Sequence, residues 1–157
     1  MSNPVKDACV EIFRECFEGV APGAGGTWFV QGNEATFETL AALTPRKASL
    51  RVSHQLATLG AHTYHLCYYL SLFNAKNRAD DVKADWAGSW KIQEFDAESW
   101  SEVASKTKQE FDEAMKWYRS STDFIDADDA EYAIANIAHA AYHLGAIRAL
   151  MPLVLRA

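Results

Sequence analysis

Two histidines one helical turn apart stand in the run IAHAAYHLGAIRAL, residues 137–150. If this run is helical, His139 and His143 lie about 6 Å apart along the axis and on one face, so their imidazoles can share a metal ion. The surrounding residues are almost all apolar, and a buried imidazole nitrogen without a partner costs free energy. A shared ion would satisfy both rings, which favours a metal site. The alternative is a helix whose histidines are buried or solvated without any metal.

The other three histidines precede this pair, and all five fall on only two of the predicted helices. His62 and His65 are three residues apart and share a helix face. His54 is aligned with His65 around the axis but lies about 16 Å from it along the axis, too far for one ion. We therefore expect a single site that contains His139, His143 and either His62 or His65.

A three-histidine site limits the chemistry that is possible. Three neutral imidazoles leave one position open on a four-coordinate ion, and Zn²⁺, Ni²⁺ and Fe²⁺ all suit nitrogen ligands. Bound water reaches a pKa near ~7 and a bound thiol loses its proton, so the site could support hydrolysis or thiol transfer. A zinc peptidase needs a glutamate beside the first histidine. Ala140 stands there and residues 136–157 contain no acidic side chain, so peptidase activity is not expected.

Three further residues near the pair are candidates for supporting roles. Asn136, three residues before His139, could orient that ring, or it could bond the local backbone instead. Tyr142 could line a pocket, or pack in the core or at an interface. Arg148 could hold a substrate carboxylate, or form an ion pair at the surface or between subunits.

Four segments with helical periodicity must position these residues. They cover residues 4–18, 49–77, 99–120 and 128–155, and a short additional helix is expected at 36–43. Asn3 and Pro4 are typical of a helix start, and Gly19 of a helix end. Ser99 and Glu102 have the spacing of a capping box.

No alternating strand pattern competes with these helices. The sequence therefore predicts an all-α protein, a four-helix bundle in a single domain, residues 1–157. Two long connections, 19–47 and 78–97, leave part of the topology open. The short link before the last helix predicts that the last two helices are antiparallel neighbours.

Composition excludes several classes of partner. Lys and Arg number 15 and Asp and Glu 21, giving a net charge of −6, which argues against nucleic acid and anionic membranes. No apolar stretch is long enough to span a membrane, and charges occupy the N-terminal region where a signal peptide would be apolar. Cys9, Cys16 and Cys67 do not form a disulfide framework, so a reducing cytoplasm is expected. The Gly-Ala-Gly-Gly run at 23–26 lacks the Gly-Lys-Ser/Thr ending of a phosphate loop.

Three stretches resemble the DinB-like family of damage-inducible metal-binding proteins. HAAYHLG, residues 139–145, resembles the last-helix signature of that family, in which two histidines precede a glycine. TLGAHTYHL, residues 58–66, resembles the second-helix signature, where the metal-binding histidine precedes a leucine. DWAGSW, residues 85–90, resembles a subgroup of the family. The resemblance extends over most of the chain from Pro45 to Leu150.

This resemblance implies a four-helix bundle, a homodimer, and a metal site made of His65, His139 and His143. Related transferases use the metal to activate a low-molecular-weight thiol, which implies a metal-dependent thiol S-transferase with zinc or nickel and an electrophilic substrate. The alternative is a non-catalytic metal-binding protein in stress response or partner binding. Family members often have Gln where Ala146 stands and a further His at Tyr142, differences that leave the three ligands intact.

Overall fold

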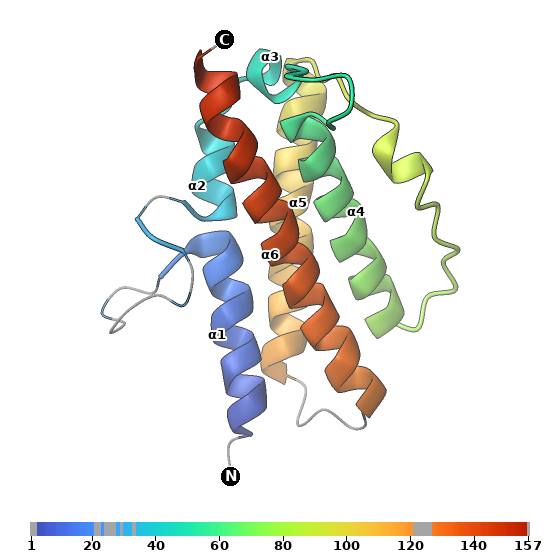
Figure 1. The fold of residues 1–157 in the computed structure, drawn as a ribbon. Helices are drawn as coiled ribbons and strands as arrows, with labels where there is room; N and C mark the ends of the chain where they lie inside the picture. The colour runs from blue at the N-terminus through green and yellow to red at the C-terminus, as the bar shows by residue number, and fades with distance from the viewer. Residues whose placement is uncertain are drawn as a thin grey trace.

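A computed structural model describes residues 3–20, 23, 28, 30–32, 34–120 and 127–156. All regular structure within these ranges is helical, as expected. In chain order the elements are α1 (Pro4–Glu18), α2 (Thr36–Ala41), α3 (Pro45–Ala48), α4 (Leu59–Asn77), the 3₁₀ turn η1 (Gly88–Trp90), α5 (Ala97–Ser120) and α6 (Ala127–Arg156) (Figure 1). Of the Gly-Ala-Gly-Gly run, only Gly23 lies within the described residues.

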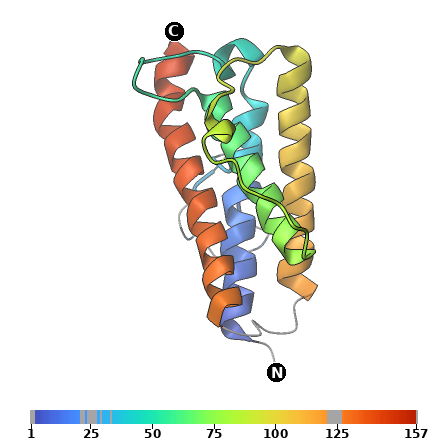
Figure 2. The ribbon, with the colours of Figure 1, turned by 90° about the vertical axis from the view of Figure 1, so that its right-hand side faces the viewer.

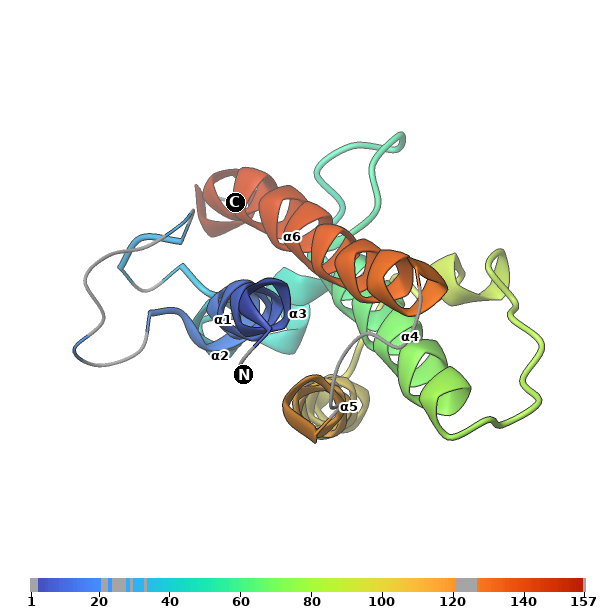
Figure 3. The same ribbon diagram turned by 90° about the horizontal axis from the view of Figure 1, so that it is seen from below.

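The four longest helices pack lengthwise. Helix α4 packs against both α5 and α6, and α1 packs against the same two helices on the other side. Seen from below, α5 and α6 occupy opposite corners of this arrangement (Figure 3). They run antiparallel, as predicted, but the prediction that they are neighbours is wrong. A link of six residues can reach about 20 Å when extended, so a short link does not force two helices to be adjacent.

Local capping explains where α1 begins and ends. The side chain of Asn3 accepts hydrogen bonds from the backbone N–H groups of Val5 and Lys6, and Pro4 occupies the first helical position. At the other end the backbone N–H of Gly19 donates to the carbonyl of Glu15, with φ at +77°, a conformation that favours glycine. The predicted limits of this helix are confirmed.

Helix α4 starts ten residues later than the sequence pattern predicted, at Leu59 rather than at 49. The hydroxyl of Thr58 accepts from the N–H of Ala61 and therefore caps the helix. The side chain of Gln93 accepts from the N–H of Thr58 and so holds this cap from the following connection. Residues 49–58, which follow the end of α3, are not helical. His54 lies in this segment and is exposed, rather than on a helix as predicted.

The start of α5 also differs from the prediction. Helix α5 begins at Ala97, because the capping pair is Asp96 with Ser99 rather than Ser99 with Glu102. The carboxylate of Asp96 accepts from the N–H of Ser99, and the hydroxyl of Ser99 accepts from the N–H of Asp96. Helix α6 runs from Ala127 past the exposed Pro152 to Arg156, within one residue of the predicted 128–155 at each end.

The interior consists mainly of two apolar clusters. One is aromatic and is shared by all four long helices; its largest members are Phe13, Phe17, Phe73, Phe111 and Tyr118. The other joins the ends of α4, α5 and α6 to α2 and α3, and includes Leu40, Leu59 and Ile147. The three cysteines are free and buried in these clusters, as expected. Within the described residues, no helix has the length and apolarity that crossing a membrane requires.

Candidate metal centre

Helices α4 and α6 bring three histidines together. His65 on α4 and His139 and His143 on α6 each place one ring nitrogen within 4.8 Å of the others. The Nε2 atoms of His65 and His139 are 3.3 Å apart. His65 and His143 are buried, with 6% and 1% of their surface exposed, and His139 is half-buried.

The arrangement follows from helix geometry. His139 and His143 are one turn apart on α6 and both face α4, which packs along α6. His65 lies near the middle of α4 and meets the pair across the seam between the two helices. The structure therefore brings together His139 and His143, which the spacing singled out, and His65, one of the two alternatives for the third ligand.

His62, the other alternative, lies at the side of this cluster. Its Nδ1 is 3.1 Å from the Nδ1 of His143, and its ring meets Trp90 edge-on. It contacts one member of the cluster but is not part of the group whose nitrogens face one another.

Aromatic rings cover two of the three imidazoles. Trp90 stacks on His65 with ring centroids 4.1 Å apart and an interplanar angle of 19°. Tyr69 stacks on His139 at 3.7 Å and 16°. Sequence reasoning gave neither residue a role, although Tyr69 follows His65 by one helical turn and could have been placed on the same face. Trp90 belongs to the DWAGSW segment, whose contact with α4 depends on the path of the connection (Figure 2).

A serine of the same segment was also missed. The hydroxyl of Ser89 lies 2.7 Å from the Nδ1 of His65 and 2.7 Å from the carbonyl oxygen of Trp86, to which it donates. Ser89 is buried. Nothing in its sequence position distinguishes it from a turn serine.

Burial keeps these imidazoles neutral near pH 7. It lowers the pKa of His62 and of His65, and proximity to His62 contributes at His65. Burial, followed by the neighbouring His65, lowers the pKa of His139 to about 4. Burial and the other three histidines lower the pKa of His143 to about 2. Neutral rings offer lone pairs to a cation, which is the protonation state that metal binding requires.

The three predicted supporting residues have different surroundings. Asn136 is buried and its amide donates to the hydroxyl of Tyr118 at 3.3 Å, on the core side of α6. Tyr142 is 67% exposed and meets the ring of His143 edge-on. Arg148 forms an ion pair with Glu34, which favours the ion-pair interpretation over a role at the metal site.

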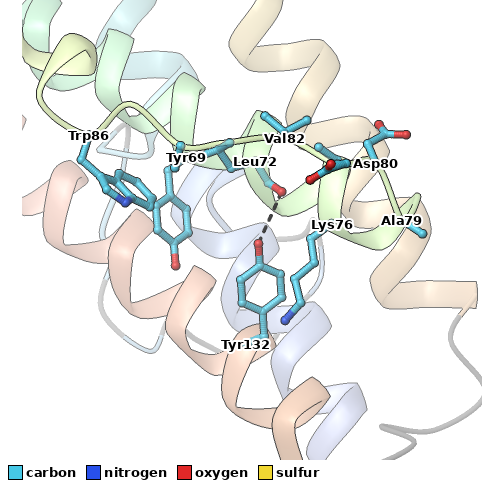
Figure 4. Close-up of a pocket in the computed structure, with 11 residues that line it drawn as sticks. Tyr69, Leu72, Lys76, Ala79, Asp80, Val82, Trp86 and Tyr132 are labelled. Carbon is cyan, nitrogen blue, oxygen red and sulfur yellow. Dashed lines mark hydrogen bonds between the residues drawn. The ribbon is translucent and has the colours of Figure 1, made fainter.

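A cavity of about 600 Å³ is lined in part by Tyr69 and Trp86, whose rings also lie beside the histidines. Tyr69 and Trp86 lie side by side at one end of it, and Lys76 and Tyr132 line its middle (Figure 4). Tyr69 also stacks on His139, and Trp86 lies beside His65 with ring centroids 6.4 Å apart. The cavity therefore shares a wall with the candidate metal centre.

Comparisons with known proteins add nothing to this geometry: no protein-family model, no curated protein and no solved structure matches the chain.

Proposed function

We propose that this protein binds a divalent metal ion through His65, His139 and His143. The observation that carries the proposal is the 3.3 Å separation of two Nε2 atoms in a buried cluster of neutral imidazoles. Two nitrogens bound to one tetrahedral ion at about 2.0–2.1 Å are themselves about 3.3 Å apart. The spacing of His65 and His139 thus suits a shared ion, and the third nitrogen, on His143, lies within 4.8 Å of both.

Zinc and nickel are the ions that we propose first, with iron third, because imidazole nitrogen suits all three. Three protein ligands leave one position for water or another small ligand. When bound, the ion would supply Lewis acidity and lower the pKa of a coordinated thiol or water.

For the activity we propose a metal-dependent thiol S-transferase within a DinB-like four-helix bundle that forms a homodimer. The cavity beside the site supports this proposal, because Tyr69 and Trp86 provide an apolar wall for a small electrophile. Thiol transfer needs little more from the protein than a held thiolate and a place for the second reactant. Ala140 stands where a zinc peptidase has its glutamate, so peptidase activity is not proposed.

A second candidate is a non-catalytic metal-binding protein in stress response or partner binding. The observation that favours it is the covering of the cluster: His143 is 1% exposed, and Trp90 and Tyr69 stack on the other two rings. A site that is closed in this way suits a tightly held ion with limited access for a substrate.

Metal content tests the proposal directly. Protein purified without a His tag should carry about one ion per chain, measured by elemental analysis. His139→Ala should carry none, whereas His54→Ala should match the parent, because His54 is exposed and outside the cluster. Equal metal in His139→Ala and the parent would contradict the site.

Turnover then separates the two candidates. The zinc- or nickel-loaded protein is incubated with a panel of low-molecular-weight thiols and electrophiles, and loss of free thiol is followed. Turnover that requires His139 supports the transferase. A fully loaded protein with no turnover across the panel supports the non-catalytic alternative.

A further inference from the structure

The hydroxyl of Ser89 determines which nitrogen of His65 carries the proton. Ser89 Oγ has one hydrogen, and the carbonyl of Trp86 at 2.7 Å can only accept it. Ser89 Oγ must then accept from the nitrogen on its other side, the Nδ1 of His65 at 2.7 Å. His65 is thereby held with its proton on Nδ1 and a lone pair on Nε2.

We propose that Ser89 is a positioning residue that fixes the Nδ1–H tautomer of His65 and so presents its Nε2 lone pair to the metal. This inference rests on the proposed metal-binding function for its purpose, but the tautomer itself follows from the hydrogen bonds. Ser89 and His65 are both buried, with 3% and 6% of their surface exposed, so water does not compete easily for these bonds. Ser89 lies in η1, which packs on α4, and thus links the connection to the site.

The tautomer of His139, whose Nε2 faces that of His65, should respond differently to metal. Without an ion, the lone pair of His65 Nε2 is satisfied when His139 carries its proton on Nε2, 3.3 Å away. His139 Nδ1 is then an acceptor. Within the described residues it has no hydrogen-bond partner, and neither has the buried Oδ1 of Asn136, one turn earlier on α6.

For His139 to hold an ion through Nε2, that nitrogen would have to offer its lone pair, so the neutral ring would carry its proton on Nδ1 instead and no net proton would be released. Metal binding therefore changes the tautomer of His139 and leaves that of His65 unchanged.

Nuclear magnetic resonance of the ¹⁵N-labelled full chain tests this. Long-range ¹H–¹⁵N correlations distinguish the two neutral tautomers of each ring. In the metal-free protein we expect Nδ1–H for His65 and Nε2–H for His139; on addition of zinc alone, only His139 changes. Nε2–H at His65 in the metal-free protein would overturn the inference, even if zinc binds.

Zinc affinity gives a second readout, measured by competition with a chromophoric chelator. Ser89→Ala should weaken binding about 10–100-fold, as is usual for residues that orient metal ligands. Ser89→Thr keeps a hydroxyl and should restore most of the affinity.

Ser49→Ala is the matched control. The hydroxyl of Ser49 likewise accepts from an N–H, that of Phe95, and donates to a carbonyl, that of Pro45, both at 2.8 Å. It touches none of the histidines, so its removal should leave zinc affinity unchanged. Parent-like affinity in a folded Ser89→Ala would overturn the positioning role, whereas a parent chain that binds no metal would overturn the proposed function instead. If Ser89→Ala does not fold, the tautomers of the parent chain still decide the inference.

Discussion

Two groups of buried polar side chains lie against α6 and differ in how their hydrogen bonds close. In the aromatic core, the hydroxyl of Tyr118 donates to the carbonyl of Ala133 at 2.7 Å and accepts from the amide of Asn136. The Tyr118 hydroxyl has both a donor and an acceptor there, so these bonds join α5 to α6 without help from any ligand, although the Oδ1 of Asn136 has no partner among the described residues. Hydrogen bonds of this kind between helices add rigidity to a core.

The histidine cluster, which begins one turn further along α6, is arranged differently. The Nε2 atoms of His65 and His139 face one another across 3.3 Å with one proton between them in the metal-free chain, and His139 Nδ1 is buried without a partner among the described residues. Two facing ring nitrogens of this kind can be joined by a single proton or by a cation. The Tyr118 group is therefore a polar contact that stabilises the fold, whereas the histidine cluster is one that a ligand would complete.

A variant that damages the histidine cluster should lose the stabilisation by zinc, whereas one that damages the Tyr118 group should lose metal-free stability. This contrast is the largest effect that we expect. Zinc at 100 times its Kd should raise the free energy of unfolding of the parent by about 2.7 kcal/mol. His139→Ala should lose this increment. Tyr118→Phe should keep it but lower the metal-free stability by about 1–3 kcal/mol, because the amide of Asn136 loses its acceptor.

Urea denaturation with and without zinc measures both quantities for each variant. His54→Ala serves as the control and should change neither, because its side chain is exposed in a loop. If Tyr118→Phe also lost the zinc increment, the two groups would be one coupled unit, and the distinction drawn here would be wrong.

The sequence predicted the two groups unequally well. Periodicity was sufficient for the all-helical fold, and the one-turn spacing of His139 and His143 was sufficient to place them on one face. Spacing on a single helix could not choose between His62 and His65, because that choice depends on how α4 sits against α6. The resemblance favoured His65, and the structure places His65 within the cluster.

Residues that act through tertiary contacts were beyond pattern reasoning. Ser89 and Trp90 reach the site only because the connection after α4 folds back over that helix (Figure 2). The start of α4 depends on a bond between Thr58 and Gln93, which are 35 residues apart. Asn136 was a candidate either to orient His139 or to bond the local backbone, yet its amide bonds Tyr118, a partner on a helix that sequence spacing cannot bring near.

The metal-free protein should lose stability in mild acid, an effect that belongs to the histidine group. The pKa values of His139 and His143 are about 4 and about 2 in the folded chain, below the ordinary value of 6.5, because burial disfavours the charged rings. The unfolded chain therefore binds protons first as the pH falls. The stability that the neutral rings contribute is complete above about pH 6.5 and is lost progressively as the pH falls towards about 4 and below.

Thermal unfolding between pH 7.5 and pH 5, in the presence of a chelator, measures this loss. A variant with both His139 and His143 replaced by Gln should show a flatter profile, because Gln does not titrate in this range. Tyr118→Phe should be less stable throughout but should keep the slope of the parent. A parent profile as flat as that of the double variant would contradict the neutral cluster.

The smallest effect is expected at His62, which touches the cluster from the side. Its Nδ1 meets only the Nδ1 of His143, at 3.1 Å. His62→Gln keeps an acceptor in that place and should change zinc affinity by no more than about threefold. His62→Leu leaves the buried Nδ1 of His143 unpaired and should weaken zinc binding about tenfold. His65→Gln, the matched loss of a proposed ligand, should abolish binding in the same chelator competition. Should His62→Gln also abolish it, His62 would be a ligand, and the facing arrangement of the other three would be only part of the site.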